Sequence, residues 1–327
     1  MSNNKIDIVY LWVDGGDKKW RDARNFWSVS KQKNDYLYRD NGELKYSLRS
    51  VAECVNWVNH IYIVTGFNQK PKWLNIKNPK ITIVPHEQIM PKSAIPTFNS
   101  NSIEMCISNI PNLSEKFILM NDDTFFNKKL EPNFFFDRRN RAIVLYNNHK
   151  NRRIDVDKWL NESDNYTRTL ILSALKIQEI FRKKCLHYKP SHGIDPYIKS
   201  SIIECKNHPM IKNDLNKQIK NKFRTGNEFQ RWIFNLYGVF SGTGVFKKAR
   251  GYKSGKHWLS NFIYNTIHYK SVRQSPVFCF DAFENRKSIE HAPIFCINDS
   301  NDTKSKTTEN NIKFLQKRFP NKCEFEK

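Results

Sequence analysis

The sequence predicts an α/β protein built on a mostly parallel sheet that is flanked by helices. Over the first 126 residues, short runs rich in β-branched and aromatic residues alternate with segments whose apolar residues recur at helical spacing. Such repetition favours a parallel sheet with helices on its faces. Polar residues also follow the first and the fourth expected strand, where ligands bind in open α/β sheets.

The first part of the chain supplies the elements of this sheet. Four short apolar runs are expected as strands: Ile6 to Val13, Ile61 to Thr65, Ile81 to Val84 and Phe117 to Met120. Two segments with helical periodicity are expected as helices: Tyr46 to Val58 and Ser102 to Ile110. The chain has 327 residues, 39% of them hydrophobic, which is enough for a sizeable core and excludes a disordered protein.

The rest of the chain differs in composition. Residues 147–230 are rich in Lys, Arg and Asn and predict an α-rich basic insertion, with helices at Asp164 to Lys184 and Ile198 to Cys205. Two later apolar runs, Phe229 to Val245 and Val277 to Phe280, are expected as strands that return to the core, and residues 231–327 form the C-terminal part. A polar loop from Asn298 to Asn311 and a terminal helix from Glu309 to Phe319 follow. Residues 1–146 form the remaining α/β part.

Charge and cysteine usage narrow the class of protein. The 55 Lys and Arg against 32 Asp and Glu give a net charge of +23, which predicts an anionic partner such as nucleic acid, an acidic membrane or phosphorylated substrates. An AT-rich genome would also enrich Lys and Asn. The seven cysteines lack any Cys-x-x-Cys pair, which favours reduced thiols in a cytosolic protein. We expect neither a signal peptide nor a membrane-spanning segment.

Asn121, Asp122 and Asp123 end the fourth expected strand and form the most informative motif. Adjacent carboxylates repel one another unless a cation or water offsets their charge. An oxygen-only pair suits Mg²⁺ or Mn²⁺, which binds few carboxylates and takes its other ligands from water and substrate phosphates. The alternative is a polar turn that closes a buried strand.

Two turns near the N-terminus carry further candidates. Trp12, Asp14 and Gly15 end the first strand, where an Asp can accept a hydrogen bond from a ribose or base and a Trp can stack on a base. The alternative is a plain strand-to-loop turn. Arg39, Asp40, Asn41 and Glu43 precede a helix, and Arg39 could clamp a phosphate. The alternative is a solvated turn with a helix cap.

Later segments add a second set of candidates. Asn99 and Ser100 could hold a sugar hydroxyl, although Ser100 or Asn101 as a helix cap is the safer interpretation. His192 is a candidate general base, with His187 as its competitor. Arg224 could reach a phosphate, and Asn298, at the end of another apolar run, could add an oxygen to a metal site.

Dinucleotide and P-loop fingerprints are absent from the sequence. Ser241 to Gly244 contains a lone Gly-x-Gly, which is better explained as a turn.

In this order, the motifs resemble the four conserved blocks of the Stealth family of sugar-1-phosphate transferases. The family includes bacterial capsular and exopolysaccharide phosphotransferases and the catalytic subunit of the animal N-acetylglucosamine-1-phosphotransferase for lysosomal glycoproteins. The segment from Ile6 to Gly15 resembles the first block, and Arg39 to Phe125 the long second one. His192 to Arg224 resembles the third block, whose start also aligns on His187, and Phe295 to Asp299 with Phe319 and Pro320 resembles the fourth.

The resemblance implies a glycosyltransferase-A-like fold and a nucleotide-sugar donor, often UDP-linked. It implies transfer of a hexose-1-phosphate to a hydroxyl of a polysaccharide or lipid-linked oligosaccharide, with release of nucleoside monophosphate. Residues 1–146 would then bind the donor, residues 147–230 the acceptor, and residues 231–327 would complete the core.

The roles that follow from the resemblance are expectations. Asp122 and Asp123, with Asn298, would hold Mg²⁺ (or Mn²⁺), and Asp123 could alternatively act as base. His192 would accept the hydroxyl proton, Arg224 and Arg39 would steady phosphates, and Asp14 and Trp12 would face the nucleoside.

Two other functions compete with sugar-1-phosphate transfer as interpretations of the sequence. An ordinary metal-dependent glycosyltransferase would form a glycosidic bond and release a nucleoside diphosphate. A nucleic-acid-binding protein is disfavoured, because the basic residues are spread widely and the acidic strand end at Asp122 would repel a phosphate backbone. The charge also fits a cytoplasmic enzyme that associates peripherally with the inner membrane face.

Overall fold

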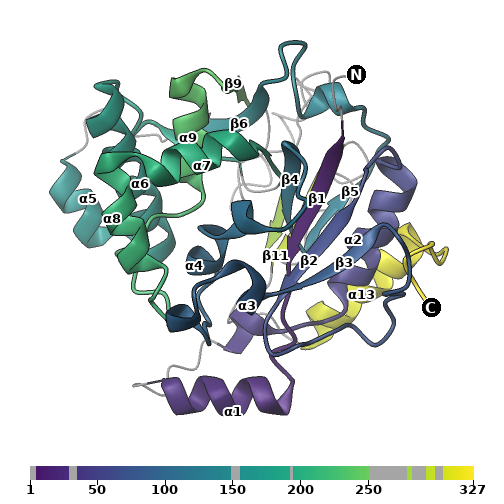
Figure 1. Cartoon of the computed structure of the whole chain (residues 1–327). Coiled ribbons are helices and arrows are strands. Elements are labelled where there is room, and N and C mark those ends of the chain that lie inside the picture. Colours follow the sequence, from purple (N-terminus) through teal and green to yellow (C-terminus); the bar gives the residue numbers. More distant parts are fainter. Residues whose placement is uncertain are drawn as a thin grey trace.

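The structure, a computed structural model, describes residues 5–28, 35–148, 155–191, 194–249, 278–281, 292–298 and 305–327. Its centre is a five-stranded sheet in the order β3-β2-β1-β4-β8 (Figure 1). The strands are β1 (Ile6–Leu11), β2 (Ile61–Thr65), β3 (Ile81–Pro85), β4 (Lys116–Asn121) and β8 (Asp195–Ile198). The first four run parallel, and β8 is antiparallel to β4. The predicted α/β class with a mostly parallel sheet is confirmed.

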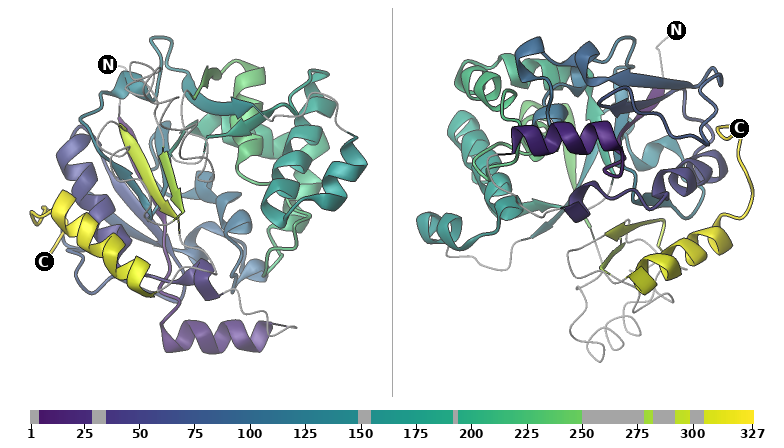
Figure 2. Two further views of the ribbon diagram at one scale, coloured as in Figure 1. Left: turned by 180° about the vertical axis from the view of Figure 1, so that it is seen from behind. Right: turned by 90° about the horizontal axis from the view of Figure 1, so that it is seen from below.

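The strands of this sheet are apolar along their whole length because both faces are covered. Ile8 and Tyr10 pack with the side chains of α2 (Glu43–Cys54) on one face, whereas Val9 points to the other face. All three are fully buried, as expected for parallel strands that lie between helical layers. The terminal helix α13 (Ser305–Arg318) packs beside α2, as Figure 2 shows from behind.

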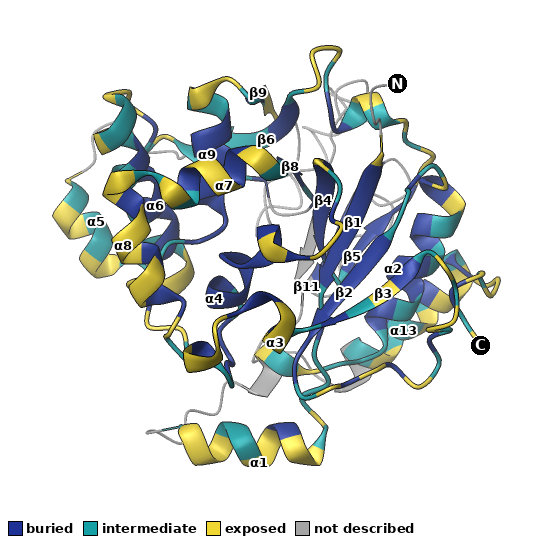
Figure 3. Cartoon of the chain, viewed as in Figure 1, coloured by how far each residue is buried: buried dark blue, intermediate teal, exposed yellow. Residues whose placement is uncertain are grey.

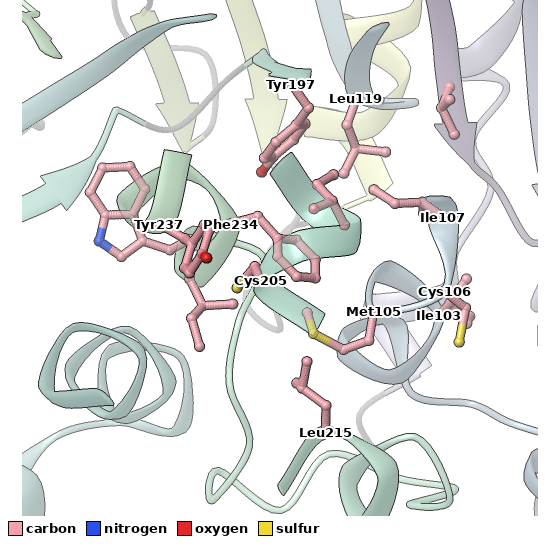
Figure 4. Close-up of a cluster of buried hydrophobic side chains, with 14 of the residues drawn as sticks. Ile103, Met105, Cys106, Ile107, Leu119, Tyr197, Cys205, Leu215, Phe234 and Tyr237 are labelled. Carbon is pink, nitrogen blue, oxygen red and sulfur yellow. The ribbon is translucent and has the colours of Figure 1, made fainter. Parts of the chain in front are cut away.

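The second face is covered by the helical part of the chain. Its helices are α4 (Ser100–Glu104), α6 (Asn165–Phe181), α7 (Lys199–Asn207), α8 (Pro209–Gln218) and α9 (Trp232–Ser241). Figure 4 shows part of the cluster that they form with the sheet: Met105 at the end of α4, Cys205, Leu215 and Phe234 belong to the same buried cluster as Leu119 of β4. The remaining α-helices of the described residues are α1 (Lys18–Trp27), α3 (His86–Ile89) and α5 (Val156–Glu162).

Two three-stranded sheets complete the described architecture. One has the order β10-β11-β5 and the other β7-β6-β9. Their strands are β5 (Thr124–Phe126), β6 (Ala142–Asn148), β7 (Tyr188–Pro190), β9 (Gly244–Lys248), β10 (Phe278–Asp281) and β11 (Ile294–Asn298). Because β11 pairs with β5, the C-terminal part of the chain lies directly beside the turn that holds Asp122 and Asp123.

The expected strand from Phe229 to Val245 is wrong. The structure has helix α9 there, followed after Gly242 by strand β9. The helix is apolar on every side because it lies inside the core, so it has no period that could distinguish it from a buried strand. Gly242 ends it with a φ of 97°, a left-handed conformation suited to glycine.

Several other helix and strand boundaries differ from the expected ones. The expected helix at Ser102 to Ile110 is α4 followed by a separate 3₁₀ turn at Ile107–Asn109. Its cap is the side chain of Asn99, which accepts from the N–H of Asn101, rather than Ser100 or Asn101. Within the expected helical insertion, β8 returns to the central sheet. The terminal helix begins at Ser305, inside the expected loop.

Candidate functional site

The carboxyl ends of the parallel strands gather the predicted residues at one edge of the sheet. In the β1–β4 pair, Leu11 lies opposite Asn121. The turn that follows β1 and carries Asp14 therefore begins beside the turn that follows β4 and carries Asp122 and Asp123. This is the edge where open α/β sheets bind ligands.

The acidic turn is short and fixed from both sides. Asn121 ends β4, and Thr124 begins β5, so Asp122 and Asp123 are the only residues between the two strands. The N–H of Ile297 donates to the carbonyl oxygen of Asp123 at 2.9 Å. This bond places the end of β11, and with it the backbone of Asn298, next to Asp123. The side chain of Asn298 lies outside the description.

Carboxylates crowd this edge. Burial raises the pKa of Asp122 well above its ordinary value, and the negative charges of Asp123, Glu43 and Asp40 raise it further. Burial raises the pKa of Glu43 to about 7 and also raises the pKa of Asp40. Without a cation the site thus favours partly protonated carboxyls, because several close anions with little solvent are unfavourable.

The donor set at this edge fits a hard divalent cation. Within the described part of the chain, no group of three or more His, Cys, Asp or Glu side chains is arranged as a ready metal cage. Mg²⁺ does not need one, since it binds through one or two carboxylates and keeps water and substrate phosphate as its other ligands. Asp122 and Asp123 supply such a pair, and their mutual repulsion is what a cation would relieve.

The turn before α2 is rigid and faces Asp122. Gly42 has a φ of 86°, and its N–H donates to Asp40 Oδ1 at 2.9 Å. The backbone and side-chain amides of Asn41 donate to the two carboxylate oxygens of Glu43, each at 2.8 Å. Because Glu43 is buried, this segment is more than the solvated turn that the sequence left as an alternative. Arg39 is exposed.

The turn after β1 is held by two close approaches. Gly15 donates its N–H to the carbonyl oxygen of Tyr38 at 2.9 Å, and a Cβ at this position would lie 2.2 Å from the same oxygen. Only glycine fits there without a shift. The side-chain amide of Gln69 pairs with both the N–H and the carbonyl of Asp14, at 3.0 and 2.9 Å. Asp14 Oδ1 accepts from the N–H of Gly16.

Trp12 does not offer the ring face that the sequence suggested. Its side chain is only 6% exposed and packs in the core cluster with Leu44 and Leu48 of α2. A tryptophan buried in this way cannot stack on a base without leaving the core, so the expected contact of Trp12 with the nucleoside does not fit this structure.

Phe67, which no motif singled out, is the aromatic residue placed at the binding edge. It lies two residues past the end of β2 and has a φ of 56°, an uncommon conformation for a bulky side chain that is enriched at functional sites. Its half-buried ring stacks on Phe98 at a centroid distance of 5.9 Å, and Phe98 stacks on Phe223 at 5.2 Å. The only signal in the sequence is an aromatic residue just past a strand end.

Asn99 and Ser100 join the binding edge to the helical part. Asn99 is fully buried, and its amide donates to the carbonyl oxygens of Asn221 and Phe223 and to Glu228. Because these bonds occupy its side chain, binding of a sugar hydroxyl by Asn99 does not fit. Ser100 accepts a hydrogen bond from the guanidinium of Arg224, an exposed side chain that is thereby held against α4.

Arg231 is a buried link to the acidic turn that nothing in the sequence marks. Its guanidinium contacts Glu104 at 3.1 Å and Asp195 at 2.9 Å, and donates to Asn121 Oδ1 at 3.1 Å. Burial raises the pKa of Glu104, while the charges of Arg231 and Arg224 lower it. Arg231 thus holds the residue that immediately precedes Asp122.

The two histidines that were candidates for the general base, His192 and His187, differ in position. His192 lies outside the described residues. Asp195, three positions later in the sequence, pairs with Leu119 near the end of β4, so β8 begins at the edge of the sheet that carries Asp122. His187 is exposed, and its ring lies against that of Tyr188, the first residue of β7. Strand β7 belongs to the sheet β7-β6-β9 and not to the central sheet.

Comparison with known proteins identifies the family. Residues 4–28 match the model of Stealth protein conserved region 1, and residues 37–144 match conserved region 2. The chain is 33% identical over 261 residues to capsular polysaccharide phosphotransferase cps1A of Actinobacillus pleuropneumoniae, covering 75% of this chain and 68% of that protein. The chain belongs to the Stealth family, as its motifs predicted.

Two further relatives and one solved structure define the extent of the likeness. Capsular polysaccharide phosphotransferase WcwK of Streptococcus pneumoniae is 29% identical over 99% of both chains. Exopolysaccharide phosphotransferase cps2G of Lactiplantibacillus plantarum is 49% identical over 132 residues, 40% of this chain and 39% of that protein. Among solved structures, the chain is similar to the galactosyltransferase LgtC with a TM-score of 0.45 and 10% sequence identity. The superposition covers 96% of this chain and 95% of LgtC.

Arg231→Met is expected to lower the free energy of unfolding by about 3–5 kcal/mol, because it leaves the buried carboxylates of Glu104 and Asp195 without their cation. Urea unfolding measures the loss. Arg141→Met is the matched control, since its ion pair with Asp137 is partly exposed and should contribute less than about 1 kcal/mol. Equal losses in the two variants would contradict the structural role of Arg231.

Proposed function

We propose that this protein transfers a hexose-1-phosphate from a nucleotide sugar, UDP-linked, to a hydroxyl of a glycan acceptor. The product is a phosphodiester, and the nucleoside monophosphate leaves. The observation that carries the proposal is the crowding of Asp122, Asp123, Glu43 and Asp40 at the ligand-binding edge of the sheet. The names of the relatives, capsular and exopolysaccharide phosphotransferases, support the reaction class.

The cation follows from the same carboxylates. Asp122 and Asp123, with Asn298, would hold Mg²⁺ or Mn²⁺. When bound, such an ion supplies positive charge that neutralises the diphosphate of the donor. The support is the raised pKa of Asp122, since a carboxyl forced toward protonation by its neighbours gains most from a cation.

The remaining roles belong to side chains around the acidic turn. Arg224, which Ser100 holds at the start of α4, would bind a phosphate oxygen through its planar fork. Arg39, exposed beside Asp40, would reach the donor from the other side. His192 would accept the proton of the attacking hydroxyl.

Attack by that hydroxyl oxygen on the β-phosphorus forms the new P–O bond. The bond to the nucleoside monophosphate then breaks, and its electron pair leaves with the monophosphate.

For the nucleoside, we propose Phe67 in place of Trp12. Its half-buried ring is supported from one side by Phe98, and the neighbouring Gln69 fixes the Asp14 turn. An aromatic ring with one supported face provides a stacking surface for a base. Asp14 lies in the adjacent turn and would accept from the ribose or base.

The acceptor is proposed to be a growing surface polysaccharide or a lipid-linked oligosaccharide at the inner membrane face, with the enzyme in the cytoplasm. The net charge of +23 supports attraction to anionic glycans and lipids. In the described part of the chain, no helix combines the length and apolarity that crossing a bilayer requires.

The decisive experiment identifies the nucleotide product. The full chain is incubated with UDP-, GDP- and CMP-linked sugars, a glycan acceptor and Mg²⁺, with EDTA in parallel tubes. Release of UMP, formation of a phosphodiester by ³¹P NMR and loss of both in EDTA are expected. A CMP-linked sugar has no β-phosphate to transfer and is the negative control. Release of UDP with a glycosidic product would replace the proposal with ordinary glycosyl transfer.

Asp123→Asn is expected to lower the rate of UMP release by about a hundredfold or more, since it removes a charge that is placed at the diphosphate. Steady-state kinetics at several Mg²⁺ concentrations measure the loss. Asp157→Asn, on an exposed turn of α5, removes the same charge elsewhere and should leave the rate unchanged. Full turnover by Asp123→Asn would refute the assignment.

Phe67→Ala is expected to weaken UDP binding about tenfold in the presence of Mg²⁺, because one stacked base contributes on the order of 1–3 kcal/mol. Inorganic pyrophosphate has no base, so its affinity should not change. Calorimetric titration with both probes makes the comparison, and Phe26→Ala on α1 is the aromatic control. An equal loss for both probes, or for neither, would show that Phe67 does not contact the base.

A further inference from the structure

Helix α1 exposes large aromatic side chains to solvent. Phe26 is 81% exposed and Trp27 is 42% exposed, and their rings meet edge to face at 5.6 Å. Such exposure is unusual for two adjacent aromatic residues on a helix, and Figure 3 shows that most of α1 is exposed. Trp20 anchors α1 to the body of the protein: it is buried, and its ring lies tilted against that of Tyr38 at a centroid distance of 4.9 Å. Trp27 follows Trp20 by seven residues and lies on the same side of the helix, whereas Phe26 points about 120° away from it.

Basic residues outnumber acidic residues on α1, and one of them, Lys18, forms an ion pair with Asp22 at 2.7 Å. Helix α1 carries four basic residues, Lys18, Lys19, Arg21 and Arg24, and one acidic residue, Asp22. Lys18, Lys19 and Arg21 are exposed. From the helical part, Lys222 places its ammonium 4.5 Å from the ring centroid of Trp27. We call Lys18, Lys19, Arg21, Phe26 and Trp27 the α1 surface.

We propose that the α1 surface docks the protein onto an anionic lipid surface. A short helix with exposed Phe and Trp beside Lys and Arg has the composition of helices that lie in the lipid headgroup region. The exposed ring of Phe26 enters the boundary of the acyl chains, and the basic residues add electrostatic attraction to the anionic headgroups. With ten residues, α1 lies on the bilayer and does not cross it.

The position of α1 determines how the ligand-binding edge of the sheet would be oriented after docking. Helix α1 begins at Lys18, directly after the turn of Asp14 and Gly15 that lies at the ligand-binding edge. Seen from below in Figure 2, it crosses the end of the molecule to which β1 leads. Docking through α1 would turn this edge toward the lipid, where a lipid-linked acceptor sits. This consequence rests on the proposed function, but the docking itself does not.

Charge and apolarity together favour lipid over the other anionic partners. The lysines and arginines could bind the phosphates of a nucleic acid. The exposed side chain of Phe26 would add nothing to that binding. A lipid surface uses both features at once, because apolar insertion and electrostatic attraction add.

The test is vesicle flotation of the full chain without any substrate. We expect binding to vesicles of phosphatidylcholine mixed with phosphatidylglycerol, little binding to phosphatidylcholine alone, and loss of binding at high salt. Phe26→Ser should lower the bound fraction at least about tenfold, because the apolar ring no longer inserts among the acyl chains. Ile203→Ser is the matched control: it removes a 42% exposed apolar residue from α7 and should bind as the unchanged chain does.

A second pair of variants tests the charge. Lys19→Glu with Arg21→Glu should abolish binding, whereas Lys212→Glu with Lys217→Glu, the same charge change on α8, should preserve most of it. Thermal unfolding by circular dichroism confirms that each variant folds.

Several results would overturn the proposal: no binding by the unchanged chain, equal binding to both kinds of vesicle, or full binding by Phe26→Ser. Because the assay contains no nucleotide sugar, its outcome is independent of the proposed transferase reaction.

Discussion

Repulsion among the carboxylates of Asp122, Asp123, Glu43 and Asp40 is the constraint around which the binding edge is organised. Their neighbours hold the anions in place instead of separating them. The N–H of Ile297 fixes the carbonyl of Asp123, Asn41 occupies both oxygens of Glu43, and Gly42 binds Asp40. Burial and the neighbouring charges raise the pKa of Asp122, so keeping these acids together is unfavourable for the ionised forms, and perturbed groups of this kind are typical of functional sites.

The parts of the site that were predictable are those encoded by neighbouring residues. A run of apolar residues that stops at Asn121, Asp122 and Asp123 shows both a buried strand and an acidic strand end. The same holds for β2 and β3, whose observed bounds differ little from the expected ones. The first four strands of the central sheet and the acidic turn after β4 are each encoded by a short run of neighbouring residues, and these were predicted correctly.

The parts that could not be predicted depend on contacts between distant segments. Arg231 becomes important only because folding brings Glu104, Asp195 and Asn121 around its guanidinium. Asn99 loses its expected role because residues more than a hundred positions away occupy its amide. Helix α9 was mistaken for a strand since a segment buried on all sides carries no polar face to reveal its period.

The protein has a local cluster of acidic residues but a strongly positive net charge. The electrostatic effects of the cluster and of the net charge extend over different distances. The net charge of +23 favours the approach of anions from solution, although salt screens charges that are more than about 10 Å apart. The acidic turn acts only at contact, where it would reject a diphosphate that arrives without a cation. Basic residues on α1 and acidic residues past β4 therefore do not compete. In the proposed reaction the first set would determine which surface the protein approaches, and the second would determine which ligand can bind at the edge of the sheet.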